Sequence, residues 1–471
     1  MINPLLNPMN SIPLLKSYIF DTNRLKRSNP EQVKRYRDKA LKRIVKYAYT
    51  VPLYHDKYKK AGVHPSDIKG IDDIVKLPMI SKNDMRENFP DRILPIGYKK
   101  DKVHVICTGG TTGKSISIYT DFYTMSGGSI PFFRDVKAFN LNWRSANFAN
   151  IGNFNPYRVD LVVQENFRKH LETFFSWDNQ LDIDVNIPAK ELIDKLDQFK
   201  PDIILGYPAI FQHLAFLKRK GYGKNIKPTV LYAAGEILDD YTRKYVEDAF
   251  GCRLLNSYQS VEAHGIIASE CIYGNWHIHW DLFNLEAMDD NGELVAPGER
   301  GHLVMTRLWG RGTPMVRYTG MDDWVKIIPI KKCKCGLNTP VIDGGVEGRK
   351  RANIVLPSGK VFPPGAFCFV EPVLTKYKSF VIKRYQVIQK KIDEIEILLV
   401  IDEDLRNVGV SIDVIKKEIK ENYEKKVGPE VKVTVNEVDE IRNDENPLKP
   451  APIVITKVKL EEGFKVLENK T

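Results

Sequence analysis

Residues Thr108-Gly109-Gly110-Thr111-Thr112-Gly113-Lys114 form a glycine- and threonine-rich segment with the composition of a phosphate-binding loop. Glycines let the backbone approach an anion and present N–H groups to it, while the hydroxyls and the Lys114 ammonium add donors and positive charge. A polar hairpin turn would need only one or two of these residues. A Walker loop would need a glycine where Thr108 stands and a helix directly afterwards, whereas residues 115–120 alternate like a strand. The segment therefore predicts a nucleotide-phosphate site that is neither a Walker loop nor a Rossmann fingerprint.

Four residues supply the ligand set of a closed zinc site, namely Cys271, His277, Cys333 and Cys335. The two halves of the set are about sixty residues apart, so their spacing alone is a moderate signal. His279 competes with His277 as the nitrogen ligand, and four unrelated residues are the plain alternative. The pattern favours Zn²⁺ in a stabilising and not a catalytic role.

The elements that would position these residues alternate between strand and helix in the middle of the chain. We expect strands at residues 202–206, 229–234 and 253–258, with helices from Pro208 to near Gly221 and over residues 239–250. This βαβαβ order implies a parallel sheet with helices on its faces. Shorter strands at residues 102–107 and 115–120 flank the glycine-rich turn, and Asn-Gly at 291–292 marks a hairpin.

The length of 471 residues exceeds what one hydrophobic core usually serves, so we expect two domains. The pattern changes after residue 348, where strands at 395–401 and 431–438 and a helix at 412–423 form a compact α+β unit. We therefore predict an α/β protein with parallel and mixed sheets. Residues 1–348 would form a large domain with a mostly helical lead-in over 1–100, and residues 349–471 a small α+β C-terminal domain.

The composition of the chain excludes some classes of protein and favours others. The net charge of +11 comes from basic residues spread along the chain and interleaved with 60 acidic ones, which favours attraction of anionic nucleotides and coenzymes over nucleic-acid binding. Six cysteines are too few for a disulfide scaffold. No apolar run is long enough for a membrane span, and prolines interrupt the first twenty residues, so we expect a cytoplasmic protein without a secretory signal.

The glycine-rich segment also resembles the phosphate loop of the acyl-adenylate-forming enzymes. Residues 44–54, 61–63 and 77–84 resemble one branch of them, the phenylacetate–coenzyme A ligase-like family with its capsule-associated and coenzyme F390 synthetase-like members. The resemblance runs over about residues 30–460. It implies the adenylate-forming enzyme fold, and activation of a carboxylic acid by ATP with Mg²⁺, followed by transfer of the acyl group to coenzyme A. It also suggests a homodimer, because dimers are common in this branch.

The family's motifs assign nucleotide roles to particular residues. The segment Tyr258-Gln259-Ser260-Val261-Glu262 is similar to Tyr-Gly-x-Thr/Ser-Glu, whose glutamate helps to hold Mg²⁺, although Gln259 and Val261 depart from the pattern. The segment Ala233-Ala234-Gly235-Glu236 resembles the adenine side of the site. Residues 317–322 are similar to Arg-Tyr-x-Thr-Gly-Asp, whose aspartate binds the ribose hydroxyls. This role would fall to Asp322, with Asp323 as the competing choice.

The resemblance further implies a hinge and a catalytic lysine. Gly348-Arg349 matches the hinge Gly-Arg, whose arginine reaches the nucleotide, but Arg351 and Ala352 replace the acidic pair that usually follows. Lys449 is the best match to the lysine that contacts the α-phosphate during adenylation, although the preceding glycine is missing and a surface lysine is the alternative. The C-terminal domain would rotate about residue 349 between the two half-reactions.

Two classes of rival remain open. The same adenylation could end in transfer to an amine or stop after the first step, and the departures at residues 259, 261, 351 and 448 also permit a catalytically inactive zinc-containing binding protein. The acid itself is not identified by the sequence. Aromatic residues between Phe132 and Tyr157, with Tyr207 and Tyr232, are candidates for its pocket, although such residues are equally compatible with a core.

Overall fold

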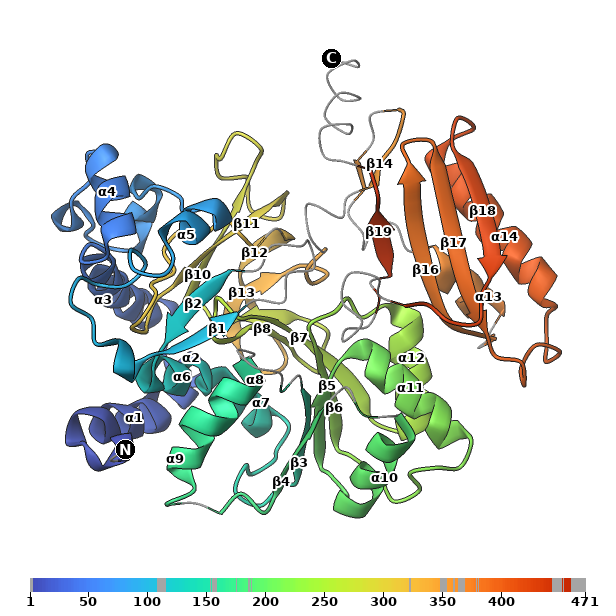
Figure 1. Cartoon of the computed structure of the whole chain (residues 1–471), viewed down its shortest axis with the longest axis horizontal. Helices are drawn as coiled ribbons and strands as arrows, with labels where there is room; N and C mark the ends of the chain where they lie inside the picture. The colour runs from blue at the N-terminus through green and yellow to red at the C-terminus, as the bar shows by residue number, and fades with distance from the viewer. Residues whose placement is uncertain are drawn as a thin grey trace.

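The computed structural model describes residues 3–107, 116–152, 154, 159–174, 176–184, 187, 189–321, 323–347, 354–358, 361–362, 369–377, 379, 381–442, 451 and 453–458 (Figure 1). Five α-helices lead in: α1 (Pro8–Phe20), α2 (Arg24–Arg27), α3 (Pro30–Ala48), α4 (Pro52–Lys60) and α5 (Lys82–Asn88). The mostly helical lead-in predicted for residues 1–100 is present, and the apolar stripe of α3 is buried. Ser81 caps α5, because its hydroxyl accepts a 3.1 Å hydrogen bond from the backbone N–H of Asp84.

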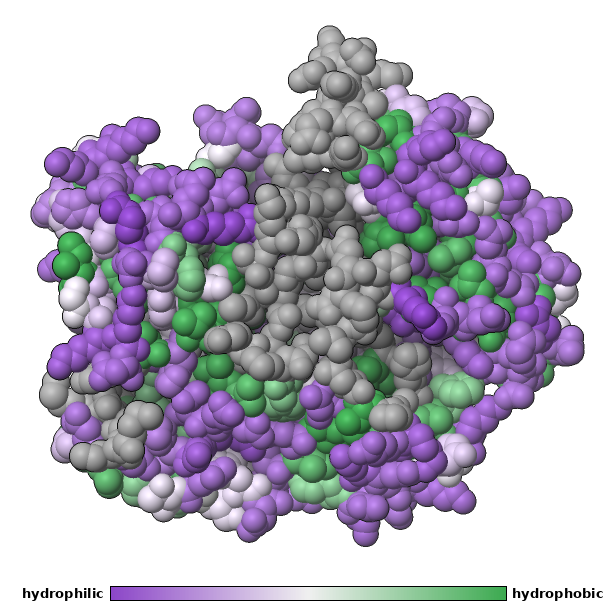
Figure 2. Space-filling model, in the orientation of Figure 1, coloured by the Kyte–Doolittle hydropathy of each residue, from purple (hydrophilic) through white to green (hydrophobic). Residues whose placement is uncertain are grey.

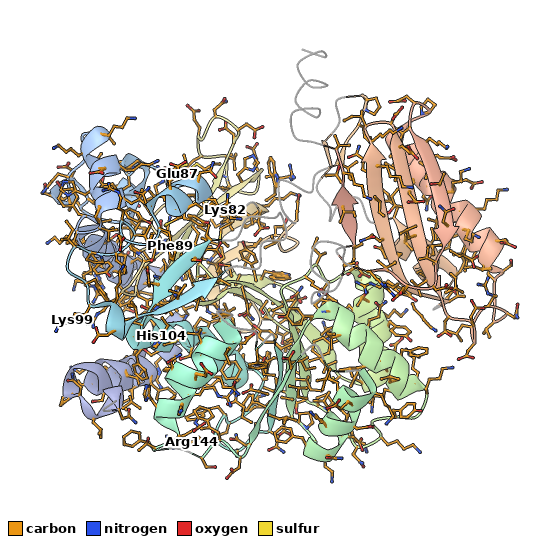
Figure 3. All side chains as sticks on the ribbon, in the orientation of Figure 1. Lys82, Glu87, Phe89, Lys99, His104 and Arg144 are labelled. Carbon is orange, nitrogen blue, oxygen red and sulfur yellow. The ribbon has the colours of Figure 1, made fainter. Side chains whose placement is uncertain are left out.

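A small hairpin follows, made of β1 (His104–Cys107) and β2 (Ser117–Thr120). The strands pair antiparallel, with His104 opposite Thr120 and Cys107 opposite Ser117. His104 marks the end of the hairpin away from the connection between the two strands (Figure 3). The glycine-rich segment is that connection. The helices α6 (Phe122–Gly128) and α7 (Ile130–Ala138) come next.

One half of the central sheet is parallel. Its strands lie in the order β7-β6-β5-β3-β4, with bounds β3 (Phe148–Gly152), β4 (Gln180–Asp184), β5 (Ile203–Gly206), β6 (Val230–Ala234) and β7 (Arg253–Ser260). Three helices pack on one face: α10 (Ala189–Phe199), α11 (Pro208–Arg219) and α12 (Asp240–Phe250). On the opposite face Val136 of α7 packs with Phe148 and Tyr232. The βαβαβ prediction for residues 202–258 is thus confirmed.

The other half of the same sheet is antiparallel. It continues from β7 in the order β8-β9-β13-β12-β11-β10, so the whole sheet has eleven strands. The bounds are β8 (Gly265–Glu270), β9 (Trp276–Ile278), β10 (Phe283–Met288), β11 (Arg300–Arg307), β12 (Trp324–Lys332) and β13 (Asn338–Ile342). The predicted turn at Asn291-Gly292 is present between β10 and β11, where Gly292 has φ of +81°.

The C-terminal unit has a sheet and a core of its own. Its strands are β16 (Ile382–Lys391), β17 (Glu394–Ile401), β18 (Lys432–Glu437) and β19 (Val454–Thr456), in the order β18-β17-β16-β19. Helices α13 (Val370–Tyr377) and α14 (Ile412–Val427) cover it, and a short pair β14 (Ile354–Val355) and β15 (Val361–Phe362) precedes it. This is the predicted separate α+β unit, at the right of Figure 1. The predicted boundary at residue 349 lies outside the described residues.

The C-terminal unit touches the large sheet's helices. The Tyr241 hydroxyl of α12 donates a 3.0 Å hydrogen bond to the carbonyl of Ile382, and the Lys383 ammonium lies 4.4 Å from the ring centre of Phe216 on α11. These contacts place the unit against the N-terminal end of α12 and the C-terminal half of α11.

A buried ion-pair network fixes the N-terminal helices to the large sheet. Asp281, fully buried, accepts hydrogen bonds of 2.9 and 2.6 Å from Arg134 of α7 and one of 3.0 Å from Arg24 of α2. Burial by itself raises the pKa of Asp281, but the two guanidinium groups outweigh it and lower the pKa below its usual value. The carboxylate is therefore ionised in the folded protein and joins residues far apart in the chain.

Replacing Asp281 with asparagine is expected to lower the free energy of unfolding by about 3 kcal/mol or more, because two buried guanidinium groups lose their counter-charge. Chemical denaturation measures the change. Glu421→Gln, at an exposed pair on α14, is the matched control and should change stability by less than about 0.5 kcal/mol. Equal effects of the two substitutions would show that the network does not anchor these helices.

Candidate functional site

Two of the predicted nucleotide segments meet at the carboxyl ends of the parallel strands. In the sheet register Gly206 of β5 lies opposite Ala233 of β6, and Ala234 lies opposite Ser257 of β7. The segments 234–236 and 258–260, predicted for the adenine side and the triphosphate side, therefore lie side by side at one edge of the sheet. Open α/β sheets bind ligands at this edge.

Gly235 and Tyr207 are in close contact at this edge. Gly235 has φ of +80°, and a Cβ atom built on it would lie 3.1 Å from Cε1 of Tyr207. The tyrosine follows β5, so its ring packs directly against the backbone that follows β6. The position requires glycine on both counts, and an alanine there would push the ring away from the sheet edge.

Tyr258 links two of the predicted nucleotide segments. Its hydroxyl donates a hydrogen bond to the carboxylate of Asp323, which is buried. Arg317, at the start of the second segment, is held by an ion pair of 3.0 Å with Glu286 and by a 2.7 Å hydrogen bond to the carbonyl of Leu77. Asp322, the first choice for the ribose, lies outside the described residues, whereas its competitor Asp323 lies next to the predicted triphosphate segment.

Glu262 lies in the tight turn between β7 and β8 and is buried, with 6% of its surface exposed. The Ser260 hydroxyl stabilises this turn by accepting a 3.0 Å hydrogen bond from the backbone N–H of Ala263. Gln259, which replaces the family's glycine, donates to the Ser257 hydroxyl at 2.8 Å, and Ser257 in turn donates to the carbonyl of Ala233. Gln259 therefore supports, from within β7, the Ser257 hydroxyl that links β7 to β6.

Arg307, at the end of β11, is a residue that the sequence analysis did not single out. Its fully buried guanidinium donates to the carbonyls of Glu262 at 3.1 Å and Thr313 at 2.8 Å. The Thr313 hydroxyl in turn accepts a 3.0 Å hydrogen bond from the backbone N–H of Tyr119 in β2. Burial lowers the pKa of Arg307 to about 10, so the group still carries its proton at neutral pH. One cation thus ties the Glu262 turn to the hairpin that carries the glycine-rich segment.

The four predicted zinc ligands lie together. The donor atoms of Cys271, His277, Cys333 and Cys335 all lie within 4.8 Å of one another. The sulfur atoms of Cys271 and Cys333 are 3.8 Å apart, and Nε2 of His277 is 3.2 Å from the sulfur of Cys335. A tetrahedral ion with Zn–S bonds of about 2.3 Å places its sulfur ligands about 3.8 Å apart. Both the donor set and its spacing therefore fit zinc.

Neighbouring groups orient these ligands. Nδ1 of His277 is 2.9 Å from the Thr339 hydroxyl, and the Asn275 amide donates to the sulfur of Cys333 at 3.3 Å. Such contacts fix the ring and the lone pairs that face a metal. Hydrogen bonding from Cys335 lowers the pKa of Cys271 to about 3, so a thiolate is favoured in the cluster.

His279, the competing nitrogen ligand, belongs to a different network. Its Nδ1 accepts a hydrogen bond from Arg134 at 3.2 Å, and its Nε2 lies 2.9 Å from the Ser269 hydroxyl. Burial lowers its pKa to about 3, which leaves the ring neutral. The two partners assign the proton to Nε2, since a guanidinium can only donate. Of the two histidines, it is therefore His277 that faces the cysteines.

Comparisons with known proteins relate the chain to phenylacetate–coenzyme A ligases and to CapK. Residues 369–447 match the family model of the CapK C-terminal domain. The chain is 26% identical over 393 residues to phenylacetate–coenzyme A ligase of Thermus thermophilus, covering 81% of this chain and 84% of that protein. It is 28% identical over 273 residues to the protein CapK of Staphylococcus aureus, covering 56% and 57%.

Solved structures show the same fold. The structure of 2-hydroxyisobutyryl-CoA ligase in the postadenylation state superposes with a TM-score of 0.76 at 17% identity, covering 95% of this chain and 94% of the other. The chain is thus similar to phenylacetate–coenzyme A ligases and to CapK. Its fold is the adenylate-forming enzyme fold, with the large α/β part and the separate C-terminal α+β unit that the sequence predicts.

Several of the family's motif residues fall outside the described part of the chain. These are the predicted phosphate loop from Thr108 to Lys114, the ribose candidate Asp322, the hinge residue Arg349 and the candidate lysine Lys449. Their roles stay predictions. The described members of the site are Ala234, Gly235, Glu236, Tyr258, Gln259, Ser260 and Glu262.

The aromatic residues considered for the acid pocket divide into two groups. Tyr232 is buried in the core beside Phe148, and its hydroxyl donates a 2.5 Å hydrogen bond to Asp135. Burial raises the pKa of Asp135 to about 6. Tyr232 is therefore a core residue, which corrects its candidacy as a pocket residue. Tyr207 remains a candidate, because it lies at the sheet edge against Gly235.

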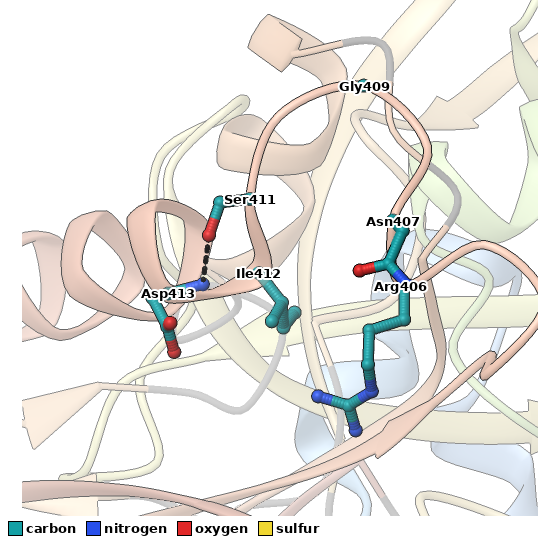
Figure 4. A pocket seen from close by; sticks show the side chains of 6 residues that line it. All are labelled: Arg406, Asn407, Gly409, Ser411, Ile412 and Asp413. Carbon is teal, nitrogen blue, oxygen red and sulfur yellow. Dashed lines mark hydrogen bonds between the residues drawn. The ribbon is translucent and has the colours of Figure 1, made fainter.

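One hollow of about 420 Å³ lies away from this edge, in the loop before α14 (Figure 4). Ser411 in its wall caps α14 by accepting a 3.2 Å hydrogen bond from the backbone of Asp413. None of the predicted site residues lines this hollow. Among the described residues, no helix is long and apolar enough to cross a bilayer.

Proposed function

We propose that this protein condenses a carboxylic acid with ATP to an acyl-adenylate, releases pyrophosphate, and then transfers the acyl group to the thiol of coenzyme A. Its similarity to two phenylacetate–coenzyme A ligases supports the class of AMP-forming acid–thiol ligases. The observation that carries the proposal is the convergence of residues 234–236, 258–260 and Glu262 at one edge of the parallel sheet.

The first half-reaction brings two anions together, since a carboxylate oxygen must attack the α-phosphorus of ATP. Positive charge and hydrogen-bond donors must therefore surround the transferred group and the pyrophosphate. In our proposal the backbone of residues 108–113 and the Lys114 ammonium hold the β- and γ-phosphates, and Glu262 holds Mg²⁺. When bound, Mg²⁺ offsets part of the triphosphate's negative charge.

The nucleoside would lie across the ends of β6 and β7. We assign residues 234–236 to the adenine side, and the ribose hydroxyls to a carboxylate at 322 or 323. The hydrogen bond from Tyr258 to Asp323 supports a shared site, because it joins the segment before Glu262 to the ribose segment. Arg349 would reach the nucleotide from the hinge.

The second half-reaction needs a different arrangement of the C-terminal unit. We propose that this unit, from about residue 349 onward, rotates after adenylation so that Lys449 leaves the α-phosphate and the thiol can enter. The contacts of Tyr241 with Ile382 and of Phe216 with Lys383 would break in that movement. The movement would expose Tyr241, whose ring is buried in the core of the C-terminal unit.

A panel of carboxylic acids scored by pyrophosphate release tests the proposal. Phenylacetate and short aliphatic hydroxy acids belong in the panel, because relatives are named for phenylacetate and structural neighbours for 2-hydroxyisobutyrate. Adding coenzyme A and analysing the products by mass identifies the acceptor. An amide product or free acyl-adenylate would favour the two rival enzymes, and absence of ATP binding by calorimetry would favour the inactive zinc-containing protein.

Replacing Lys449 with alanine is expected to slow adenylation by about 100-fold or more, because the lysine contacts charge that develops on the α-phosphate. The thiol-transfer step, started from synthetic acyl-adenylate and coenzyme A, should stay unchanged. Lys457→Ala, an exposed lysine beyond β19, is the matched control. Equal loss in both half-reactions would indicate misfolding, and loss in neither would identify Lys449 as a surface residue.

A further inference from the structure

Helix α1 presents an apolar stripe to solvent. Ile12, Leu15 and Ile19 are 52%, 60% and 46% exposed and follow one another at helical spacing on one face. Leu6 and Phe20, at 62% and 63%, extend the stripe at its two ends. Of the fifteen large apolar residues that are exposed in the described part of the chain, five thus lie within residues 6–20. The exposure is concentrated here and not scattered singly over the surface.

The inner side of the same helix is firmly attached to the protein. The Trp143 indole donates a 2.6 Å hydrogen bond to the Tyr18 hydroxyl, and the Tyr18 ring packs edge-on against Phe133 at 5.5 Å. At the other end the Asn3 amide donates to the carbonyl of His170 at 2.8 Å. Together with the Arg24–Asp281 pair, these contacts hold the segment from both ends. The apolar stripe is therefore presented by the fold and is not a frayed terminus.

The positive charge of the protein is concentrated in the same region. Residues 1–60 contain 14 Lys and Arg against 4 Asp and Glu, whereas the remaining residues contain 57 against 56. Basic residues do occur along the whole chain, as expected above, but almost the entire excess of +11 lies in the first sixty residues. No acidic residue precedes Asp21, and Asp21 pairs with Arg24.

Much of this charge is on the surface of the elements that follow α1. Lys26 and Arg27 are exposed directly after it, and α3 carries an exposed stripe of Arg35, Lys39, Lys42 and Lys46. The helices α1, α3 and α4 form one end of the molecule, the blue end in Figure 1. Figure 2 shows hydrophobic patches among hydrophilic residues at this end. Exposed apolar and basic groups thus occur together at this end of the molecule.

We propose that this end, defined as the N-terminal docking surface by Leu6, Ile12, Leu15, Ile19, Phe20 and the exposed basic residues of 26–46, binds the face of an anionic lipid bilayer. The stripe would enter the headgroup region, while the lysines and arginines remain at the level of the phosphates. Interfacial helices combine these two features, an apolar face and basic residues beside it.

Two other occupants fit the surface less well. A nucleic acid would use the basic residues through its phosphates but would leave the apolar stripe in water. A second copy of the chain would cover the stripe, but five side chains fall short of the roughly 20 residues a side of a stable interface. Two copies would also bring two strongly positive ends together. A bilayer with anionic lipids satisfies both the apolar and the charged groups.

Co-sedimentation of the full-length protein with vesicles tests this inference. We expect binding to phosphatidylcholine vesicles that contain phosphatidylglycerol, and much weaker binding to pure phosphatidylcholine. The triple variant Ile12→Ser/Leu15→Ser/Ile19→Ser should reduce partitioning by about tenfold or more. Val408→Ser/Val414→Ser, which removes exposed apolar residues of the C-terminal unit, is the matched control and should bind like the unmodified chain.

A second variant separates charge from apolar contact. Lys39→Gln/Lys42→Gln/Lys46→Gln should lower binding to the anionic vesicles by about tenfold or more, with no effect on the residual binding to neutral vesicles. Lys417→Gln/Lys420→Gln/Lys425→Gln on α14 is its control. All these positions are exposed, so an unchanged thermal midpoint is expected for every variant.

Three outcomes would overturn the proposal. The first is no binding to anionic vesicles at low salt, or binding that the apolar triple variant leaves intact. The second is a dimer in light scattering that the same variant abolishes without any vesicle binding, which would assign the surface to a second copy. The third is salt-sensitive binding to nucleic acid in place of vesicles. None depends on the enzymatic activity, so the test stands apart from the proposed ligase function.

Discussion

Replacing Glu262 with glutamine is expected to lower acid-dependent pyrophosphate release by about 100- to 1,000-fold. Glutamine keeps the size of the side chain and removes the charge that would hold Mg²⁺ on the triphosphate. The turn itself should persist, because Arg307 binds the backbone carbonyl of residue 262 and Ser260 caps the next N–H. The loss should therefore appear in the chemistry and not in the thermal midpoint.

The dependence on metal concentration makes this prediction specific. The Glu262→Gln variant should need more Mg²⁺ than the unmodified enzyme for half-maximal activity, while binding of the acid stays the same. Glu293→Gln, at an exposed position in the β10–β11 connection, serves as the control and should retain full activity and the original Mg²⁺ requirement. Unchanged turnover of the Glu262 variant would remove the basis for a nucleotide site at this edge.

The local elements could be predicted from the sequence because their signals are local. The strands expected at residues 202–206, 229–234 and 253–258 appear as β5, β6 and β7, each within one or two residues of the expected limits. Buried runs of apolar residues are typical of such strands. Asp239 and Ser81 are N-cap residue types that indicate where the helices after them begin.

What the sequence could not predict depends on long-range contacts. Asp281 meets Arg24 and Arg134, which lie 257 and 147 residues away, and no local pattern distinguishes this carboxylate from an exposed one. Arg307 is equally inconspicuous, since a single arginine at the end of a strand is usually solvated. Its role follows from the two turns that come together around it.

His277 and His279 show most clearly where prediction from the sequence stops. Both belong to the segment around β9 (Trp276–Ile278), and two residues apart on a strand they share a face. The strand register decides between them, because His277 pairs with Ser269 of β8 and Val341 of β13 and so faces the cysteines. His279 contacts Arg134 and the Ser269 hydroxyl instead. Sequence spacing alone therefore left both histidines open as ligands.

The cysteine cluster lies at the opposite end of β8 from Glu262. β8 runs antiparallel to β7, so Gly265 pairs with Ser260 near the Glu262 turn, while Cys271 follows the opposite end of β8. A metal there cannot touch the nucleotide edge directly. It would instead clamp the loop after β8 to the connection between β12 and β13, which supports a structural role.

Removing the metal from this cluster is expected to destabilise the protein by about 3 kcal/mol or more, because three thiolates and an imidazole would be left facing one another without a cation. The purified protein should contain one zinc per chain by mass spectrometry. Cobalt substitution should give the visible bands of a tetrahedral thiolate site. Chelation should lower the thermal midpoint, and added zinc should restore it.

Cys271→Ser should reproduce the destabilisation and abolish metal binding. Cys252→Ser is the matched control, since Cys252 is a free cysteine outside the cluster whose pKa burial raises to about 12. Below the new melting temperature the Cys271 variant should keep its rate of pyrophosphate release, because the cluster and the sheet edge of Glu262 are separated by the length of β8. A protein without zinc, in which both serine variants melt alike, would show that these four residues are neighbours without a metal.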